Sequence, residues 1–129
     1  MKTQEHPHVA ILREVYADLT RIAEYSDEAV VLHQANHGAP DVVGRANVLA
    51  QEEALIRMTD RTLLMDVESI IANDHFGAVL GKLRAEKARG SIAMPFCGLW
   101  RFKNGRIVEH WENAYDASEF GRFLMATGA

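Results

Sequence analysis

The chain has 129 residues, of which 48% are hydrophobic and 25% charged, and it holds 9 Gly, 3 Pro and 1 Cys. This length and composition predict one globular domain over residues 1–129 and exclude a disordered or collagen-like chain. The net charge of −4 argues against nucleic acid as a partner, and the apolar runs are too short for a membrane helix or a signal core, so we expect a cytoplasmic protein.

The first half of the chain mixes helical and extended patterns. Apolar residues recur at the three–four spacing of one helical face from about His8 to Tyr25. The short, β-branched segment Ala29–His33 predicts a strand, and residues 34–44, with two glycines and a proline, predict a loop. A second helix is predicted over Arg45–Met58, which is rich in Ala, Gln, Glu and Leu.

The second half of the chain has the patterns of a sheet. Strands are predicted over Thr62–Ala72, Phe76–Lys87, Ser91–Lys103 and Arg106–Tyr115. Asn104-Gly105 predicts a two-residue hairpin turn, because both turn positions require positive φ. A short helix follows a predicted cap at Asp116. This order predicts an α+β domain whose sheet buries one face under the helices.

Counting outward from the predicted hairpin turn assigns side chains to the two faces of the sheet. If the strands pair regularly, without a β-bulge, Trp100 lies opposite Glu109. The more apolar face then carries Phe96, Trp100, Trp111, Glu109 and Asn113. Two interpretations of Glu109 on that face are open. In one, burial raises its pKa, as a general acid or base requires. In the other, it forms an ion pair with an arginine on a neighbouring strand. A single β-bulge would invert the parity beyond it and bring Glu112 inward.

Two segments carry a family resemblance. The hairpin sequence from Leu99 to Asn113 and the helix start from Val43 to Leu49 resemble those of SnoaL-like domains in the nuclear transport factor 2-like superfamily. The match extends from about Glu24 to Leu124. It implies a cone-shaped, curved, mostly antiparallel sheet wrapped around N-terminal helices, with an internal pocket. Relatives include polyketide cyclases, a ketosteroid isomerase, dehydratases, epoxide hydrolases and proteins without known activity.

The resemblance also implies site residues. In relatives, the residue that acts as the base in the pocket lies on the first strand, eleven residues before the glycine that opens the next helix. In this chain that position is His33. The second acid of the cyclases follows the hairpin glycine by seven residues, and that position is Glu112. The cyclases' histidine on the strand before the hairpin corresponds to Gly98 here. The catalytic candidates are His33, Glu112 and Glu109, and the substrate-binding candidates are Trp100, Trp111, Phe96, His110, Tyr16 and Asn113. We expect no metal and no cofactor.

These observations leave different functions open. One is cofactor-free acid–base catalysis of the isomerase, cyclase, dehydratase or hydrolase type on a small apolar carbonyl or ring compound; His33→Ala would then abolish turnover. The alternative is a non-catalytic ligand-binding or dimerisation module, in which the tryptophans pack as core and His33 is bonded at a strand end. A third is an oligomerising partner of another protein. We expect a homodimer in each case, because relatives commonly pair through the outer surface of the sheet.

Overall fold

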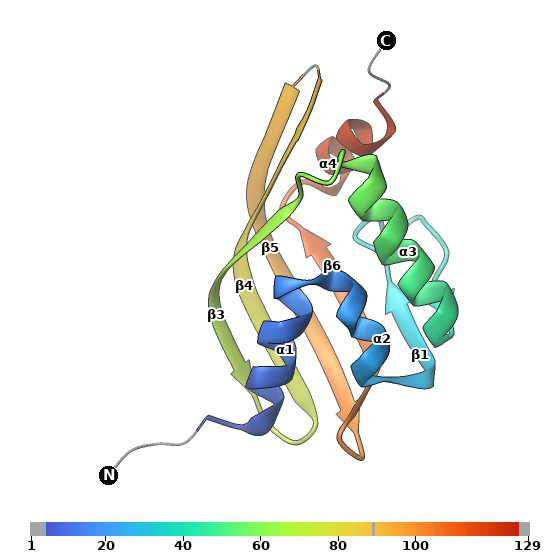
Figure 1. Ribbon diagram of the computed structural model, residues 1–129, viewed down its shortest axis with the longest axis vertical. Helices are drawn as coiled ribbons and strands as arrows, with labels where there is room; N and C mark the ends of the chain where they lie inside the picture. The colour runs from blue at the N-terminus through green and yellow to red at the C-terminus, as the bar shows by residue number, and fades with distance from the viewer. Residues whose placement is uncertain (1–4, 89, 127–129) are drawn as a thin grey trace.

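The computed structural model describes residues 5–88 and 90–126, and Figure 1 shows a twisted sheet with the helices packed against one side of it. In chain order the elements are α1 (Pro7–Ala17), the 3₁₀ turn η1 (Leu19–Arg21), α2 (Ile22–Tyr25), β1 (Ser26–His33), β2 (Val42–Val43), α3 (Arg45–Met58), β3 (Leu64–Ala72), β4 (Phe76–Lys87), β5 (Gly90–Lys103), β6 (Arg106–Ala114) and α4 (Ala117–Met125). We call the face that the helices cover the inner face, and the other the outer face.

The predicted first helix is split in two. Asp18 is extended, with φ −150° and ψ 102°, and its carboxylate accepts a hydrogen bond from the backbone N–H of Thr20 at 3.0 Å. This local cap competes with the continuing helix and ends α1 at Ala17, although the apolar spacing runs on. The bounds of α3 and β4 are as predicted.

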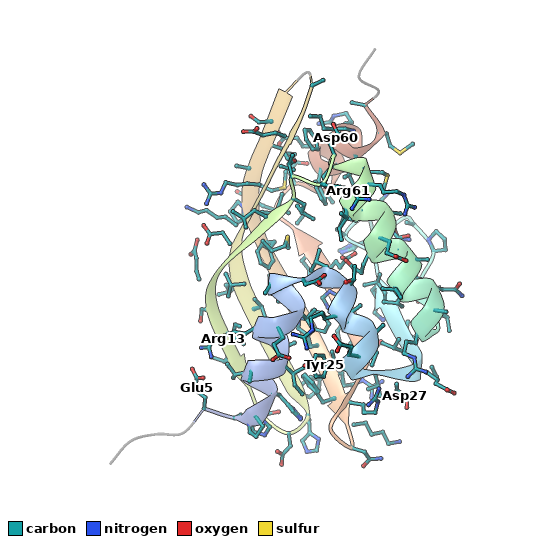
Figure 2. The ribbon with its side chains drawn as sticks, viewed as in Figure 1. Glu5, Arg13, Tyr25, Asp27, Asp60 and Arg61 are labelled. Carbon is teal, nitrogen blue, oxygen red and sulfur yellow. The ribbon has the colours of Figure 1, made fainter. Side chains whose placement is uncertain are left out.

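The strands form one six-stranded sheet in the order β2-β1-β6-β5-β4-β3. Every neighbouring pair is antiparallel except β1 and β6, which run parallel. The chain reverses from α3 toward β3 through Asp60 and Arg61, both at positive φ, which are labelled beside the end of α3 in Figure 2. The α+β class and the mostly antiparallel curved sheet are confirmed.

The hairpin contains a bulge that decides which side chains face inward. Asn104 and Gly105 have the predicted positive φ, 52° and 79°, and Phe102 pairs with Ile107. The register then shifts, so that Arg101 pairs with Glu109, Trp100 with His110 and Gly98 with Glu112. Val108 is the extra residue. The regular pairing of Trp100 with Glu109 is therefore wrong, and the bulged alternative is confirmed.

The inner face and the helices enclose the core. Trp100, Leu12 and Ile107 are at most 1% exposed. A second register shift, between Val67 and Ser69 of β3, leaves Ile70 packed against the core and Ile71 67% exposed. Ile71 therefore lies on the opposite face from Val67, although strict alternation along the strand would place both on one face.

The charged side chains of α1 lie away from the core. On α1, Arg13 donates two hydrogen bonds, each of 2.9 Å, to the carboxylate of Glu5, and Figure 2 shows both side chains at the periphery. None of the helices in the described ranges combines the length and the apolarity that a bilayer crossing requires.

Candidate functional site

A cavity of about 130 Å³ lies between the inner face of the sheet and the helices. Helices α1, α3 and α4 supply one side of its wall, and strands β5 and β6 supply the other. Most of the wall is apolar, and none of the described residues that line it is a lysine or an arginine. Its polar side chains are Tyr16, Gln34, Asn36, Gln51, Glu52, His110, Glu112 and Asn113.

Two carboxyl groups meet in this wall. Glu52, on α3, is only 3% exposed, whereas Glu112, on β6, is half-buried, and the two carboxyl groups are close enough for each to shift the pKa of the other. Burial raises the pKa of Glu112 to about 7, and burial together with the charge of Glu112 raises the pKa of Glu52 well above its usual value. Two adjacent carboxylates resist ionising together, and no described residue of the wall is a lysine or an arginine that would offset their charge, so the pair retains a proton at neutral pH. Because Glu52 is the more deeply buried of the two, the proton stays on Glu52, which can then donate a hydrogen bond to the Glu112 carboxylate.

His110 sits beside this pair as a neutral imidazole. Its ring is 4% exposed and is stacked on Trp100, with ring centroids 3.5 Å apart. Nδ1 lies 2.9 Å from the carbonyl oxygen of Leu99, which can only accept, so Nδ1 carries the hydrogen. Burial lowers the pKa of His110 to about 3. Nε2 is therefore a hydrogen-bond acceptor in the wall of the cavity, and no described residue donates to it.

Tyr16 adds a hydroxyl group from the end of α1. Trp100 donates a hydrogen bond from Nε1 to the Tyr16 hydroxyl oxygen at 3.2 Å, and the Tyr16 ring stacks on Phe96 at 5.5 Å. Burial raises the pKa of Tyr16 well above its ordinary value, so the phenol stays protonated. The cavity thus offers one phenolic O–H among aromatic rings.

The cavity brings together most of the residues that the sequence suggested. The predicted residues in its wall are Tyr16, Phe96, Trp100, His110, Glu112 and Asn113. The amide of Asn113 donates to the carbonyl oxygen of Cys97 at 3.1 Å, so part of its hydrogen-bonding capacity is already used. Their roles toward a ligand stay predictions.

His33, Glu109 and Trp111 lie on the outer face instead. The parallel register pairs His33 with Trp111 and Leu32 with His110, and opposed side chains share a face. His33 therefore follows Trp111 outward, and their rings are stacked with centroids 5.2 Å apart. The prediction that His33 lies in the pocket is wrong, because the bulge at Val108 turns Trp111 and Glu109 away from it.

The outer side chains form an ion-paired cluster across three strands. His33 contacts Asp41 through Nδ1 at 2.9 Å and Glu109 through Nε2 at 2.5 Å, and Arg101 donates to Glu109 at 2.9 Å. The hydrogen bond with Glu109 raises the pKa of His33. Burial alone would raise the pKa of Glu109, but its hydrogen bonds with His33 and Arg101 hold it below the usual value. The alternative of an ion pair for Glu109 is the one observed.

Sequence reasoning missed Glu52. Its signal is its place on the buried side of α3: Val48, four residues earlier, is 1% exposed, and Leu55, three residues later, packs against the core. A glutamate in an apolar stripe at that spacing is buried with it. Within residues 5–88 and 90–126, no group of three or more His, Cys, Asp or Glu is arranged to hold a metal ion.

Comparison with known proteins agrees with this architecture. The family model of the SnoaL-like domain matches residues 13–110. A search of the curated proteins finds no match to this chain. Solved structures are similar to it at low sequence identity, so this similarity shows the fold alone.

Three of these structures span nearly the whole chain. Bal32a, from a soil-derived mobile gene cassette, is 23% identical, with 89% of this chain and 94% of that chain covered and a TM-score of 0.77. A candidate SnoaL-like polyketide cyclase from Jannaschia sp. CCS1 is 14% identical, and the match covers 98% of this chain and 99% of that chain with a TM-score of 0.77. TerC, co-crystallised with polyporic acid, is 15% identical, with 94% and 100% covered and a TM-score of 0.75. Since the family model spans well over half of the sequence, this chain belongs to the family of SnoaL-like domains.

Proposed function

We propose that this chain catalyses cofactor-free proton transfer on a small, neutral, largely apolar carbonyl or ring compound, as an isomerase, cyclase or lyase does. The observation that carries the proposal is the proton-sharing pair of Glu52 and Glu112 in the wall of an otherwise apolar cavity. A general acid or base works best when its pKa is near the working pH. Glu112, with a pKa of about 7, meets that condition.

The two glutamates have different parts in this proposal. Glu112 keeps more exposed surface than Glu52 and lines the cavity, so it is the group that touches the substrate. Its carboxylate takes a proton from one atom of the substrate and returns it to another. In this proposal Glu52 is a positioning residue: its burial keeps its carboxyl group protonated, and that group donates to Glu112 and fixes the direction of the remaining lone pairs.

The charge of the cavity supports a neutral substrate. The described residues of its wall include no lysine or arginine, so a carboxylate or phosphate on the substrate would face Glu112 without a compensating cation. The rings of Phe96, Trp100 and Tyr16 give flat apolar surfaces that suit a ring compound.

Exchange of carbon-bound hydrogen tests this proposal. Acetophenone, a small neutral ketone, is incubated with the protein in D₂O near neutral pH, and loss of the methyl proton signal is followed by NMR. We expect faster exchange than in buffer and a loss of at least ~10²-fold in the Glu112→Gln variant. Glu109→Gln, the same change on the outer face, is the matched control and should retain exchange. Binding of acetophenone with equal exchange by wild type and Glu112→Gln would instead favour the non-catalytic binding module.

We further propose that the outer face pairs with a second copy of the chain. Ile71, Phe76, Leu80 and Leu99 are between 41% and 67% exposed on neighbouring strands, which is a large apolar surface for an isolated subunit. The face also carries two ion pairs, Arg84–Asp66 and Arg101–Glu109. Each balances a positive with a negative charge, so these pairs add no net repulsion between two copies. Light scattering should give a dimer for the wild type and a monomer for Leu99→Lys; a wild-type monomer would contradict the pairing.

A further inference from the structure

The wall of the inner cavity carries negative charge without a matching cation. Once Glu112 is ionised, the Glu52–Glu112 pair holds one negative charge, and none of the described residues that line the cavity is a lysine or an arginine. An uncompensated charge among apolar side chains is unfavourable, so the site gains stability when a ligand supplies the opposite charge.

His110 adds a second hydrogen-bond acceptor that has no partner. The residue is 4% exposed, and its Nδ1–H donates to the carbonyl oxygen of Leu99 at 2.9 Å. Every fully enclosed side-chain nitrogen or oxygen in the described ranges has a hydrogen-bond partner, whereas no described residue donates to Nε2 of His110. Nε2 is therefore not enclosed, and it borders the cavity that His110 lines. This acceptor is left for a molecule inside the cavity.

The two acceptors are neighbours beside aromatic rings. His110 and Glu112 are two residues apart on β6 and both line the cavity, so their Cα atoms are roughly 7 Å apart on one face of the sheet. Trp100 stacks on His110 with ring centroids 3.5 Å apart, and Phe96 lies in the same wall. An ammonium group has three N–H donors and no acceptor, and aromatic faces attract a cation.

We propose that the cavity binds the cation of a small amine that carries one ring, with the ammonium group between Glu112 and Nε2 of His110 and the ring against Trp100. This site goes beyond the proposed catalytic function, because the wall that disfavours an anion favours a cation. The volume of about 130 Å³ limits the ligand to one ring, since an apolar cavity of roughly 150 Å³ holds one benzene molecule. Such an amine competes with a neutral substrate for Glu112.

Calorimetry with benzylamine and benzyl alcohol tests the proposal. The two molecules have nearly the same size and shape, and both donate hydrogen bonds, but only benzylamine is positively charged at pH 8. We expect the wild type to bind benzylamine at least ~10-fold more tightly than benzyl alcohol, because hydrogen bonds between charged groups are stronger than neutral ones. Equal affinities, or no binding of benzylamine, would overturn the proposal.

Two glutamine variants locate the bound cation. Glu112→Gln should weaken the binding of benzylamine at least ~10-fold and change that of benzyl alcohol much less. Glu109→Gln, the same change on the outer face, is the matched control and should leave both affinities at the wild-type level. Full affinity for benzylamine in Glu112→Gln, or its loss in Glu109→Gln, would place the amine outside the cavity and contradict the proposal.

The imidazole of His110 gives a signal in the wild type itself. Nitrogen-15 spectra of protein with labelled histidines, recorded at pH 8 during addition of benzylamine, should show the Nε2 resonance of His110 moving to lower frequency as it accepts an N–H hydrogen bond. The resonances of His33, on the outer face, should stay in place. Benzylamine that binds without moving the His110 Nε2 resonance would contradict the assigned position of the ammonium group.

These outcomes are separable from that of the proposed function. Exchange of ketone hydrogen reports on proton transfer by Glu112, whereas benzylamine affinity reports on the charge of the cavity. Benzylamine binding as expected, without exchange, would overturn the catalytic proposal and leave the cation site standing. Exchange that depends on Glu112, without benzylamine binding, would do the reverse.

Discussion

Glu112 and Glu109 lie three residues apart on β6 and face opposite sides of the sheet. On the inner face, burial raises the pKa of Glu112 to about 7, whereas on the outer face the hydrogen bonds with His33 and Arg101 keep the pKa of Glu109 low. The histidines differ in the opposite sense. Burial lowers the pKa of His110 to about 3, and the hydrogen bond with Glu109 raises that of His33.

The difference shows that partners and water, more than residue type, decide what these groups do. The inner cavity holds a carboxyl pair, a neutral imidazole and a protonated phenol, with no cation among its described wall residues, and of these groups the carboxyl pair is the one that titrates near neutral pH. The outer cluster pairs each charge and links β1, β6 and β5 through His33, Glu109 and Arg101. The bulge at Val108 assigns each residue of β6 to its face.

The largest expected effect is on the pH dependence of stability. Folded Glu112 has a pKa of about 7 against a usual 4.5, so the folded chain binds more protons than the unfolded chain between these values. The free energy of unfolding therefore falls as pH rises from 4.5 through about 7. The Glu112→Gln variant has no carboxyl group to ionise at this position, so it does not lose stability in this way. Its free energy of unfolding relative to wild type should rise by up to roughly 3 kcal/mol between these pH values. Urea denaturation at pH 5 and pH 8 measures it.

Glu109→Gln is the control for that experiment, and its effect has the opposite sign. The lowered pKa of Glu109 means that its carboxylate stabilises the fold above the usual value of 4.5 and loses this contribution as the pH falls. The variant should be less stable than wild type near neutral pH and similar to it in acid. If the stability of both glutamine variants relative to wild type changes in the same direction as the pH rises, the contrast between the inner and outer faces is contradicted.

An intermediate effect is expected in the titration of the two histidines. At pH 5, His110 should remain neutral with its hydrogen on Nδ1, because its pKa is about 3 and Leu99 accepts from Nδ1. His33, whose pKa is raised above 6.5, should be doubly protonated at the same pH. Nitrogen-15 correlation spectra of the imidazoles, assigned with His33→Gln and His110→Gln, distinguish the two states. A His110 signal that titrates near 6.5 would contradict its burial in a cavity.

Local signals in the sequence predicted most of the fold. Alternating strands, the Asn104-Gly105 turn and the cap at Asp116, whose carboxylate accepts from Glu119 N–H at 2.9 Å, each depend on a few neighbouring residues. The prediction failed at Asp18 because a side-chain hydrogen bond, invisible in apolar periodicity, ended the helix there. That break ends α1 just beyond Tyr16.

The site was less predictable because it depends on parity and on distant residues. Nothing in the run Ile107-Val108-Glu109 indicates which residue bulges, and the choice exchanges Glu109 for Glu112 in the cavity. Glu52 and Tyr16 come from helices far from the hairpin in sequence. Only packing against the sheet brings them beside Glu112. The resemblance suggested Glu112 correctly as a cavity residue, and it misplaced His33.

The smallest expected effect is that of breaking the outer cluster. His33 and Glu109 are partly exposed, with 28% and 20% of their side-chain surface accessible, and Asp41 is 52% exposed. Solvent and salt screen such pairs, so His33→Ala should lower the free energy of unfolding by less than about 1 kcal/mol, and less still at high salt. Because His33 lies outside the cavity, the variant should also exchange ketone protons at the wild-type rate. A loss of exchange in His33→Ala with the fold intact would mean that the outer face takes part in catalysis, and the separation of the two faces would then be wrong.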